Sequence, residues 1–249
     1  MAPAEKPVAV VTGASEGIGR AIAERLSRDG MHVVIADIQD AKGEAAAREL
    51  GGSYVHCDVA QENEWNALAD GLAARFGRLD VLVNNAGINP APQDFACYPL
   101  SSWHHMLAVN LDGVFLGCRM AVNAMPKGGA IINIASAAAR KPVGDMAGYC
   151  ASKAAVCMLT KTVALYCGQH RLNIRCNAVL PGSIDTPLVN RLRDAAGDPV
   201  AARATAAARH PIGFVGAPQD IASMVGFLVS ADARFITGAE FCVDGGLTL

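Results

Sequence analysis

Short apolar runs alternate along the chain with longer stretches in which apolar residues recur every three or four positions. The short runs are rich in β-branched residues and apolar at consecutive positions, as in 8–12. Strands of a parallel sheet covered on both faces have this continuous pattern, because neither face meets water. The predicted strands are 8–12, 33–37, 54–57, 79–83, 130–134, 174–179 and 241–243.

The longer stretches have the spacing of amphipathic helices. Gly30 and Gly77 end two of them, and Ser101 or Ser102 is a suitable N-cap for the fourth. Strand and helix alternate without a repeat or a break in composition, which predicts an α/β fold. We expect one doubly wound Rossmann-type domain over 1–249, with a parallel sheet of about seven strands and helices on both faces. The predicted helices are 20–29, 41–50, 62–76, 101–125, 149–167 and 219–230.

The region 185–214 breaks this rhythm. It is rich in alanine and arginine and contains Pro187, Pro199 and Pro211. It follows the sixth strand and so begins at the carboxyl edge of the sheet, where ligands of this fold class bind. Because long insertions in compact domains are often lids, we expect a substrate lid here rather than an idle loop.

Composition excludes several classes of protein. Hydrophobic residues make up 52% of the chain, charged residues 18%, and the formal net charge is −2. A disordered chain needs the opposite balance, and nucleic-acid binding needs a basic stripe that is missing here. The first residues lack the pattern of a signal peptide, and the apolar runs are strand-sized. We therefore expect a cytoplasmic protein with no membrane partner.

Cysteine and histidine do not indicate a metal site. None of the 8 cysteines forms a C-x-x-C pair or stands at zinc-finger spacing with histidine. Reduced and mostly buried cysteines are expected instead. His104 and His105 are neighbours, and neighbours on a helix point to different faces, so a structural or exposed position is expected for both.

Glycines follow the first strand and open the first helix. Gly13, Gly17 and Gly19 permit a tight turn and a close backbone approach to a pyrophosphate, at which the helix N-terminus would point free N–H groups. The spacing G-x-x-x-G-x-G differs from the usual G-x-G-x-x-G, so the glycines alone are a weak signal. Their position after an N-terminal strand makes a dinucleotide site the preferred interpretation.

Asp37 lies 18 residues beyond Gly19, at the end of the second strand. A carboxylate there can accept hydrogen bonds from ribose hydroxyls and would repel the 2′-phosphate of NADP. Glu16 adds a second negative charge, and no cation follows at Ile38. Because a phosphate dianion beside two unpaired carboxylates is costly, the sequence predicts NAD as the cofactor. The alternative for Asp37 is an ordinary strand-end turn residue.

Tyr149 and Lys153 stand four residues apart at the start of a predicted helix and so share one face. Tyrosine has a reference pKa near 10. A nearby ammonium lowers that pKa and moves the phenol toward use as a general acid/base. Ser136, just past the fifth strand, can hold a carbonyl oxygen beside the phenol. The tyrosine and lysine alone would fit a surface helix, but their order after a strand and a serine favours an active site.

These motifs, taken in order, resemble the short-chain dehydrogenases/reductases over essentially the whole chain. The resemblance implies that Tyr149 transfers the proton, that Lys153 binds the nicotinamide ribose and lowers the Tyr149 pKa, and that Ser136 orients the substrate oxygen. It also implies that Asn110 holds a water linking Lys153 to solvent at a helix kink. The motifs are Thr12-Gly13-x-x-x-Gly17-Ile18-Gly19, Asp58-Val59, Asn84-Asn85-Ala86-Gly87, Asn110, Ser136, Tyr149-x-x-x-Lys153 and Pro181-Gly182.

The same resemblance implies the cofactor site and the assembly. Asp58 and Val59 would meet the adenine, and a homotetramer would form through the helices 101–125 and 149–167. The implied cofactor-binding residues are Gly13, Ser15, Glu16, Gly17, Ile18, Gly19, Asp37, Ile38, Asp58, Val59, Asn85, Ala86, Gly87, Tyr149, Lys153, Pro181, Gly182, Ile184 and Thr186.

The substrate pocket should be formed by 88–99, 137–146 and the lid from Leu188 onward. No cation is clearly placed to hold an anion, although Arg140 and Arg191 remain open. We expect an uncharged, hydrophobic secondary alcohol or ketone, because the expected lining is mostly apolar. It comprises Phe95, Val143, Met146, Leu188, Val189 and Leu192.

Three functions fit these residues. The first is an NAD-linked dehydrogenase similar to the secondary-alcohol and hydroxysteroid enzymes of the family. The second is a 3-oxoacyl-thioester reductase, against which Glu16, Asp37 and the balanced charge argue. The third is a nucleotide-binding protein without catalysis, which would have no use for a tuned acid/base pair.

Overall fold

The computed structural model describes residues 6–89, 93–125, 128–195 and 197–249. Its centre is a seven-stranded parallel sheet with the strand order β3-β2-β1-β4-β5-β6-β7. Each strand lies within two residues of its predicted bounds, so the predicted fold class is confirmed. The strands are β1 (Val8–Thr12), β2 (His32–Asp37), β3 (Ser53–His56), β4 (Val81–Asn84), β5 (Gly129–Ile134), β6 (Ile174–Pro181) and β7 (Glu240–Val243).

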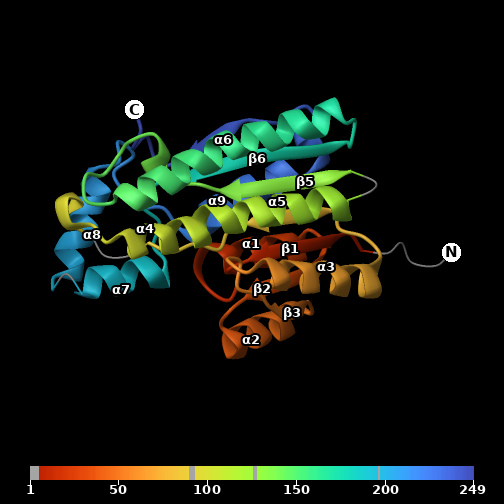
Figure 1. The fold of residues 1–249 in the computed structure, drawn as a ribbon. Helices are drawn as coiled ribbons and strands as arrows, with labels where there is room; N and C mark the ends of the chain where they lie inside the picture. Colours follow the sequence, from red (N-terminus) through yellow and green to blue (C-terminus); the bar gives the residue numbers. More distant parts are fainter. Residues whose placement is uncertain (1–5, 90–92, 126–127, 196) are drawn as a thin grey trace.

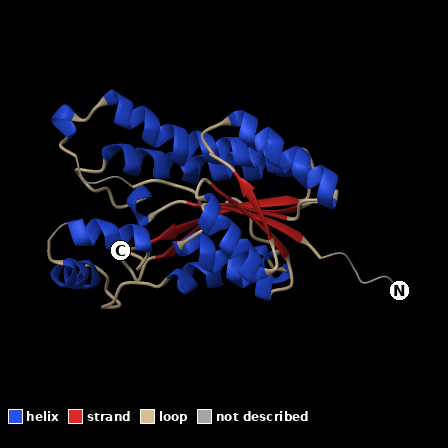
Figure 2. Cartoon of the chain, turned by 90° about the horizontal axis from the view of Figure 1, so that it is seen from below, coloured by secondary structure: helices blue, strands red, loops and turns tan. Residues whose placement is uncertain are grey.

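Helices cover both faces of the sheet (Figures 1 and 2). Residues of α1, α2 and α9 pack on one face, and residues of α3, α5 and α6 pack on the other. The helices are α1 (Gly17–Arg28), α2 (Asp40–Leu50), α3 (Glu62–Phe76), α4 (Leu100–Leu107), α5 (Gly113–Ala124), α6 (Ala147–Gln169), α7 (Pro187–Ala195), α8 (Pro199–Ala208) and α9 (Pro218–Val229).

The first strand shows why its residues must all be apolar. Val8 and Val10 point into the core under α3, α5 and α6, whereas Ala9 and Val11 point into the core under α1 and α9. Successive side chains of a strand point to opposite faces, so a strand between two helical layers needs apolar residues at every position.

Strand order reverses between β1 and β4, because the chain runs outward through β2 and β3 before it returns to the middle of the sheet. The connections therefore diverge at this point, and a crevice opens at the carboxyl ends of the two strands. The glycine turn after β1 and the loop after β4 border it.

Two helices differ from the prediction. α1 begins at Gly17, three residues earlier than expected, because the glycines of the turn belong to its first turn. The stretch 101–125 consists of α4, a π-helical turn at Ala108–Asp112 and α5. Its N-cap is the extended Pro99, so the predicted cap at Ser101 or Ser102 is wrong.

The region 185–214 contains α7 and α8, which lie at one end of the molecule (Figure 1). Asp198 begins α8 by accepting a hydrogen bond from Ala201 N at 2.9 Å, with Pro199 in the first turn. Within the described ranges, no helix has the length and apolar character needed to cross a membrane.

Candidate active site

A cleft of about 780 Å³ runs along the carboxyl ends of the strands. Of the predicted site residues, only Gly19 and Asn110 do not line it. Those that do are Gly13, Ser15, Glu16, Gly17, Ile18, Asp37, Ile38, Asp58, Val59, Asn85, Ala86, Gly87, Ser136, Tyr149, Lys153, Pro181, Gly182, Ile184 and Thr186.

Gly19 lies behind the glycine turn. A Cβ atom there would come within 2.3 Å of Gly13 O and 2.4 Å of Asn85 Nδ2. Gly13 itself has a φ of +61°, and a Cβ on it would lie 2.8 Å from Ala86 Cα. Only glycine therefore allows α1, the turn and the loop after β4 to approach so closely.

Thr12 and Asn85 fasten these two loops together. The Thr12 hydroxyl oxygen accepts hydrogen bonds from Asn85 N and Ala86 N, both at 3.0 Å. The Asn85 side-chain amide donates to Thr12 O at 2.9 Å and to Gly13 O at 3.0 Å. Thr12 belongs to the motif but was not predicted as a site residue, because its role depends on a contact with a loop 73 residues away.

Asp37 is held in a fixed orientation at the other border of the cleft. The side chain is buried, its Oδ2 accepts a hydrogen bond from Ser15 N at 2.9 Å, and its Oδ1 accepts one from Gln39 N at 3.0 Å. In the described part of the chain, Asp37 makes no ion pair. Its negative charge is therefore available to a ligand in the cleft.

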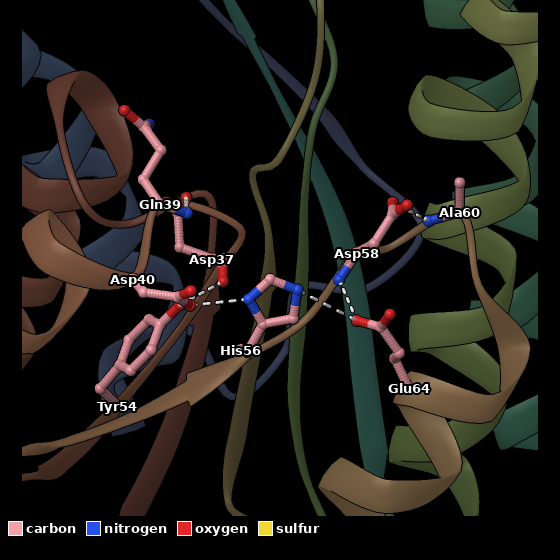
Figure 3. A network of polar contacts seen from close by, with 8 residues as sticks. All are labelled: Asp37, Gln39, Asp40, Tyr54, His56, Asp58, Ala60 and Glu64. Atoms are coloured by element: carbon pink, nitrogen blue, oxygen red, sulfur yellow. Dashed lines mark hydrogen bonds and ion pairs between the residues drawn. The ribbon is translucent and has the colours of Figure 1, made fainter.

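A polar network links Asp37 to Asp58 (Figure 3). The Tyr54 hydroxyl lies 2.7 Å from Asp37 O and 2.6 Å from Asp40 Oδ1. His56 Nδ1 lies 2.7 Å from Asp40 Oδ1, and its Nε2 lies 3.9 Å from Glu64 Oε2.

Glu64 completes the chain of contacts by accepting a hydrogen bond from Asp58 N at 2.5 Å. The hydrogen bond to Asp40 is the main reason that the pKa of His56 is raised, while Tyr54 is the main cause of the lowered pKa of Asp40. His56 thus joins the first turns of α2 and α3. No motif in the sequence indicated this network, because its members come from four separate elements.

Glu16 differs from the prediction. Its carboxylate is paired twice, to Arg191 Nη2 at 2.6 Å and to Lys42 Nζ at 2.8 Å, and the bond to Arg191 is the first cause of its lowered pKa. The expectation of two unpaired carboxylates is wrong for Glu16, because the fold brings α7 across the glycine turn. Only Asp37 still carries the charge argument against a 2′-phosphate.

Ser136 and Tyr149 meet at the carboxyl end of β5. Ser136 caps the short turn Ala137–Ala139 by accepting a hydrogen bond from Ala138 N at 3.1 Å. Burial raises the pKa of Tyr149, and a hydrogen bond with Ser136 opposes this shift. The net direction is upward, so the phenol holds its proton at neutral pH.

Lys153 is buried below Tyr149. Its Nζ donates a hydrogen bond to Ile134 O at 2.9 Å and lies 5.8 Å from the centroid of the Tyr149 ring. Burial lowers the pKa of Lys153 to about 8. The expected lowering of the Tyr149 pKa by this ammonium is not found, because burial disfavours the charged forms of both groups.

Asn110 lies fully buried in the π-helical turn, at the position of the expected kink. Its Oδ1 accepts a hydrogen bond from Ile88 N at 2.8 Å, and its Nδ2 donates to Ile88 O at 2.9 Å. A Cβ at Gly87 would lie 3.2 Å from Asn110 Oδ1 and 3.5 Å from Lys153 Nζ. Asn110 and Lys153 therefore flank Gly87.

His210 supports the loop after β6 and was missed by the sequence. Ser183 N donates a hydrogen bond to His210 Nε2 at 3.1 Å, and His210 Nδ1 lies 2.7 Å from Ala206 O on α8. A Cβ at Gly182 would come within 2.9 Å of the same Nε2. The imidazole thus ties the Pro181–Gly182 turn to the inserted helix.

The substrate end of the cleft confirms part of the expected lining. Val143, Met146, Leu188 and Val189 line it, whereas Phe95 is 73% exposed and does not. The side chain of Leu192 lies outside the described residues.

The basic side chains near this end were not predicted, and Arg191, which the sequence left open, lines the cleft beside the glycine turn in its pair with Glu16. Arg140 pairs with Glu240 at 3.0 Å and does not line the cleft. Lys141, Arg209 and His105 do line it. Their positions depend on the fold of the insertion at 185–214 and of the C-terminal turn at 244–248, which the sequence pattern did not reveal.

Comparison with known proteins places this site in a family. Residues 13–248 match a family model described as enoyl-(acyl carrier protein) reductase. The chain is 42% identical over 252 residues to 3beta-hydroxysteroid dehydrogenase 1 of Eggerthella lenta, covering 96% of this chain and 93% of that protein. The chain belongs to the short-chain dehydrogenase/reductase family.

Other members show the range of this family. The chain is 39% identical over 250 residues to an NADP-dependent (R)-specific alcohol dehydrogenase of Lentilactobacillus kefiri, covering 97% of this chain and 96% of that protein. The chain is also similar to the structure of a 3-ketoacyl-(acyl-carrier-protein) reductase from Brucella melitensis with NADH, at a TM-score of 0.90 and 31% identity. The match covers 99% of this chain and 100% of that chain. As a short-chain dehydrogenase/reductase, this chain is an oxidoreductase that acts on CH–OH groups with a nicotinamide dinucleotide.

Proposed function

We propose that this protein interconverts a hydrophobic secondary alcohol and its ketone with NAD(H). The observation that carries the proposal is the convergence of Ser136, Tyr149 and Lys153 on a cleft whose far border is the buried carboxylate of Asp37. The glycine turn fits a pyrophosphate, since α1 begins at Gly17 and the free N–H groups of a helix N-terminus favour an anion.

The bound nicotinamide supplies hydride transfer to and from the substrate carbon. In alcohol oxidation, the substrate hydroxyl gives its proton to the deprotonated Tyr149 oxygen, a phenolate, while the Ser136 hydroxyl holds the same substrate oxygen. Lys153 binds the nicotinamide ribose, and Asn110 keeps the loop at Ile88 in place above it. In ketone reduction, Tyr149 returns the proton to the oxygen.

NAD is preferred over NADP because of Asp37. Two backbone hydrogen bonds hold its carboxylate at the border of the cleft, where it can accept hydrogen bonds from ribose hydroxyls, and it makes no ion pair in the described part of the chain. At about 5 Å and an effective dielectric constant near 20, repulsion costs about 3 kcal/mol for each unit of phosphate charge. Lys42 and Arg191 lie nearby but are engaged by Glu16.

Cofactor titration tests this preference. We expect NADH to bind at least tenfold more tightly than NADPH by fluorescence titration, and Asp37→Asn to reduce or reverse that ratio. Equal affinities in the unmodified protein, or an unchanged ratio in Asp37→Asn, would show that Asp37 does not select the cofactor.

Turnover tests the reaction. We expect a panel of secondary alcohols to reduce NAD⁺, with the rise in NADH absorbance abolished in Tyr149→Phe. Similarity to a 3-ketoacyl-(acyl-carrier-protein) reductase supports 3-oxoacyl-thioester reduction as a second candidate. Faster turnover of an acetoacetyl thioester than of every simple ketone would favour it. Cofactor binding without turnover of any compound would favour a non-catalytic dinucleotide-binding protein.

We also propose that α7 and α8, within 185–214, act as a substrate lid. Leu188 and Val189 enter the cleft from α7, and the Arg191–Glu16 ion pair joins this helix to the glycine turn. Amide hydrogen exchange should slow in 187–208 when NADH and a ketone analogue bind. Unchanged exchange would argue against a lid.

A homotetramer is the proposed assembly. Large apolar side chains are exposed on α5 and α6, namely Phe115, Met158, Leu165 and Tyr166. A second copy of these helices would cover them. Light scattering should give four times the mass of the chain, with a smaller species for Leu165→Asp. The cytoplasmic location stays a prediction of the sequence.

A further inference from the structure

The charges that line the cleft are divided between its two ends. All acidic lining residues, Glu16, Asp37 and Asp58, follow β1, β2 and β3. Lys141 follows β5, and Arg209 follows α8, after β6. Four strand steps of about 4.8 Å separate β2 from β6, which puts roughly 19 Å between these regions. Among the cations of the described lining, Arg191 is paired with Glu16 beside the glycine turn, and Lys153 lies at the catalytic residues. Lys141 and Arg209 are the two that remain, and they belong to the side of the cleft that follows β5 and β6.

Lys141 is held at the border of the cleft by the C-terminal turn. Its Nζ donates one hydrogen bond to Leu247 O at 2.8 Å, and Leu247 itself lines the cleft. An ammonium has three N–H donors, so two remain for a ligand. The nearby Asp244 does not compete for them, because its oxygens accept hydrogen bonds from Gly246 N, Thr248 N and the Thr248 hydroxyl.

Arg209 reaches the same region from the insertion. Ala202, Ala206 and Arg209 line the cleft at a spacing of four and three residues, so α8 presents two methyl groups and then a guanidinium. The Arg209 side chain makes no hydrogen bond or ion pair with any other part of the chain that the structure describes. The segment that follows it packs on the C-terminal turn, where Ile212 N donates to Gly245 O at 3.2 Å.

The walls between the catalytic residues and these cations are apolar. Val143, Met146, Leu188 and Val189 line this part, and the described lining has no carboxylate other than Glu16, Asp37 and Asp58. A buried anion would be costly between such side chains, but an anion at the outer end would meet Lys141 and Arg209 while its apolar body filled the interior.

Resting on the function proposed above, we propose that the substrate carries a carboxylate, with Lys141 and Arg209 as the residues that recognise it. The substrate class is thus a hydroxy acid or oxo acid with an apolar, alicyclic or branched body. Its carbinol carbon lies at Ser136 and Tyr149, and its carboxylate lies at the outer end of the cleft. Arginine suits a carboxylate because its planar fork donates two parallel hydrogen bonds. This replaces the uncharged substrate expected from the sequence.

Matched substrates test the proposal. We would compare kcat/KM for 4-hydroxycyclohexanecarboxylate with that of its methyl ester, in the unmodified protein and in Lys141→Met and Arg209→Leu. The ratio of acid to ester should fall about 2- to 5-fold in each variant, since one ion pair at a solvent-exposed border is lost. Salt should lower the ratio in the unmodified protein. Arg48→Met removes an exposed charge from α2 and should leave the ratio unchanged.

Binding provides a readout that does not need turnover. Calorimetry should show cyclohexanecarboxylate binding to the NADH complex, with a Kd raised about 2- to 5-fold in Lys141→Met. The protein could oxidise the ester and 4-methylcyclohexanol, show no preference for the acid, and fail to bind the carboxylate. That result would overturn this inference and leave the proposed function standing. Binding of the carboxylate with no oxidation of any alcohol would support the anion site and overturn the proposed function.

Discussion

Replacing Asn110 by alanine removes the side chain that pairs with both backbone groups of Ile88, a half-buried residue of the loop after β4. Asn110 is 0% exposed, and its amide pairs with both the N–H and the C=O of Ile88, at 2.8 and 2.9 Å. A buried polar group left without a partner costs about 1–3 kcal/mol. Because Ile88 is half-buried, its two groups keep partial access to water, and we expect a loss of about 1–3 kcal/mol in the free energy of unfolding.

This loss is large against a total stability of about 5–15 kcal/mol for a typical domain. We would measure it by urea unfolding at one fixed protein concentration, following the fluorescence of the buried Trp65. Asn123→Ala is the matched control. Asn123 also donates from a helix to a backbone carbonyl, Arg119 O at 3.0 Å, but it does so at the surface. The control should lose less than about 0.5 kcal/mol.

The reasoning would be refuted by a loss below about 1 kcal/mol in Asn110→Ala, or by equal losses in the two variants. Either result would mean that water or a backbone shift satisfies Ile88 without the amide. Asn110→Ala should also weaken NADH binding, because the loop at Ile88 and Gly87, which Asn110 holds in place, lines the cleft. A fall in stability with unchanged NADH affinity would separate the structural role from the proposed site.

Three further predictions concern titrating groups. Alcohol oxidation needs the Tyr149 phenolate, and the pKa of Tyr149 is raised, so the rate of oxidation should increase from pH 6 to 10. The rate of ketone reduction should stay level at neutral pH. An oxidation optimum at or below pH 7 would contradict this prediction. Lys153 has a pKa lowered from 10.5 to about 8, so burial opposes its charge. Lys153→Met should therefore raise the unfolding free energy at pH 7 by about 1–3 kcal/mol, a gain that disappears above pH 10 in urea titrations. The raised pKa of His56 implies stabilisation that is complete below pH 6.5 and lost as pH rises through its folded value. His56→Gln should flatten this part of the pH–stability curve, and an unchanged curve would remove His56 as its cause.

Most of the fold was predictable because its pattern is local. A parallel strand with helices on both sides needs consecutive apolar residues, and each such run could be recognised without knowing its neighbours. The bounds of α1 and α4 were less predictable, since Gly17 enters a helix that glycine normally disfavours and Pro99 replaces the expected serine caps. The order of the strands and the packing of the helices required the three-dimensional structure.

The candidate site divides in the same way. Residues that border the cleft, such as Asp37 and Ser136, were predicted because each stands at the carboxyl end of a strand, and these ends meet at one edge of the sheet. The pairing of Glu16 was not predicted, because Arg191 is 175 residues away. His56 and His210 were missed for the same reason: neither belongs to a motif, and each acts by joining distant segments.

The sequence by itself determined the α/β fold class, the glycine turn, and the tyrosine–lysine pair on one face of a helix, since all three depend on periodicity or on short spacing. Tertiary structure alone decided which charges meet. It placed Arg191 and Lys42 on Glu16, buried Lys153 deeply enough to lower its pKa to about 8, and brought Lys141 to the substrate end of the cleft. The physical reason is that electrostatic energy depends on distance and burial, and both are set by contacts between segments far apart in the chain.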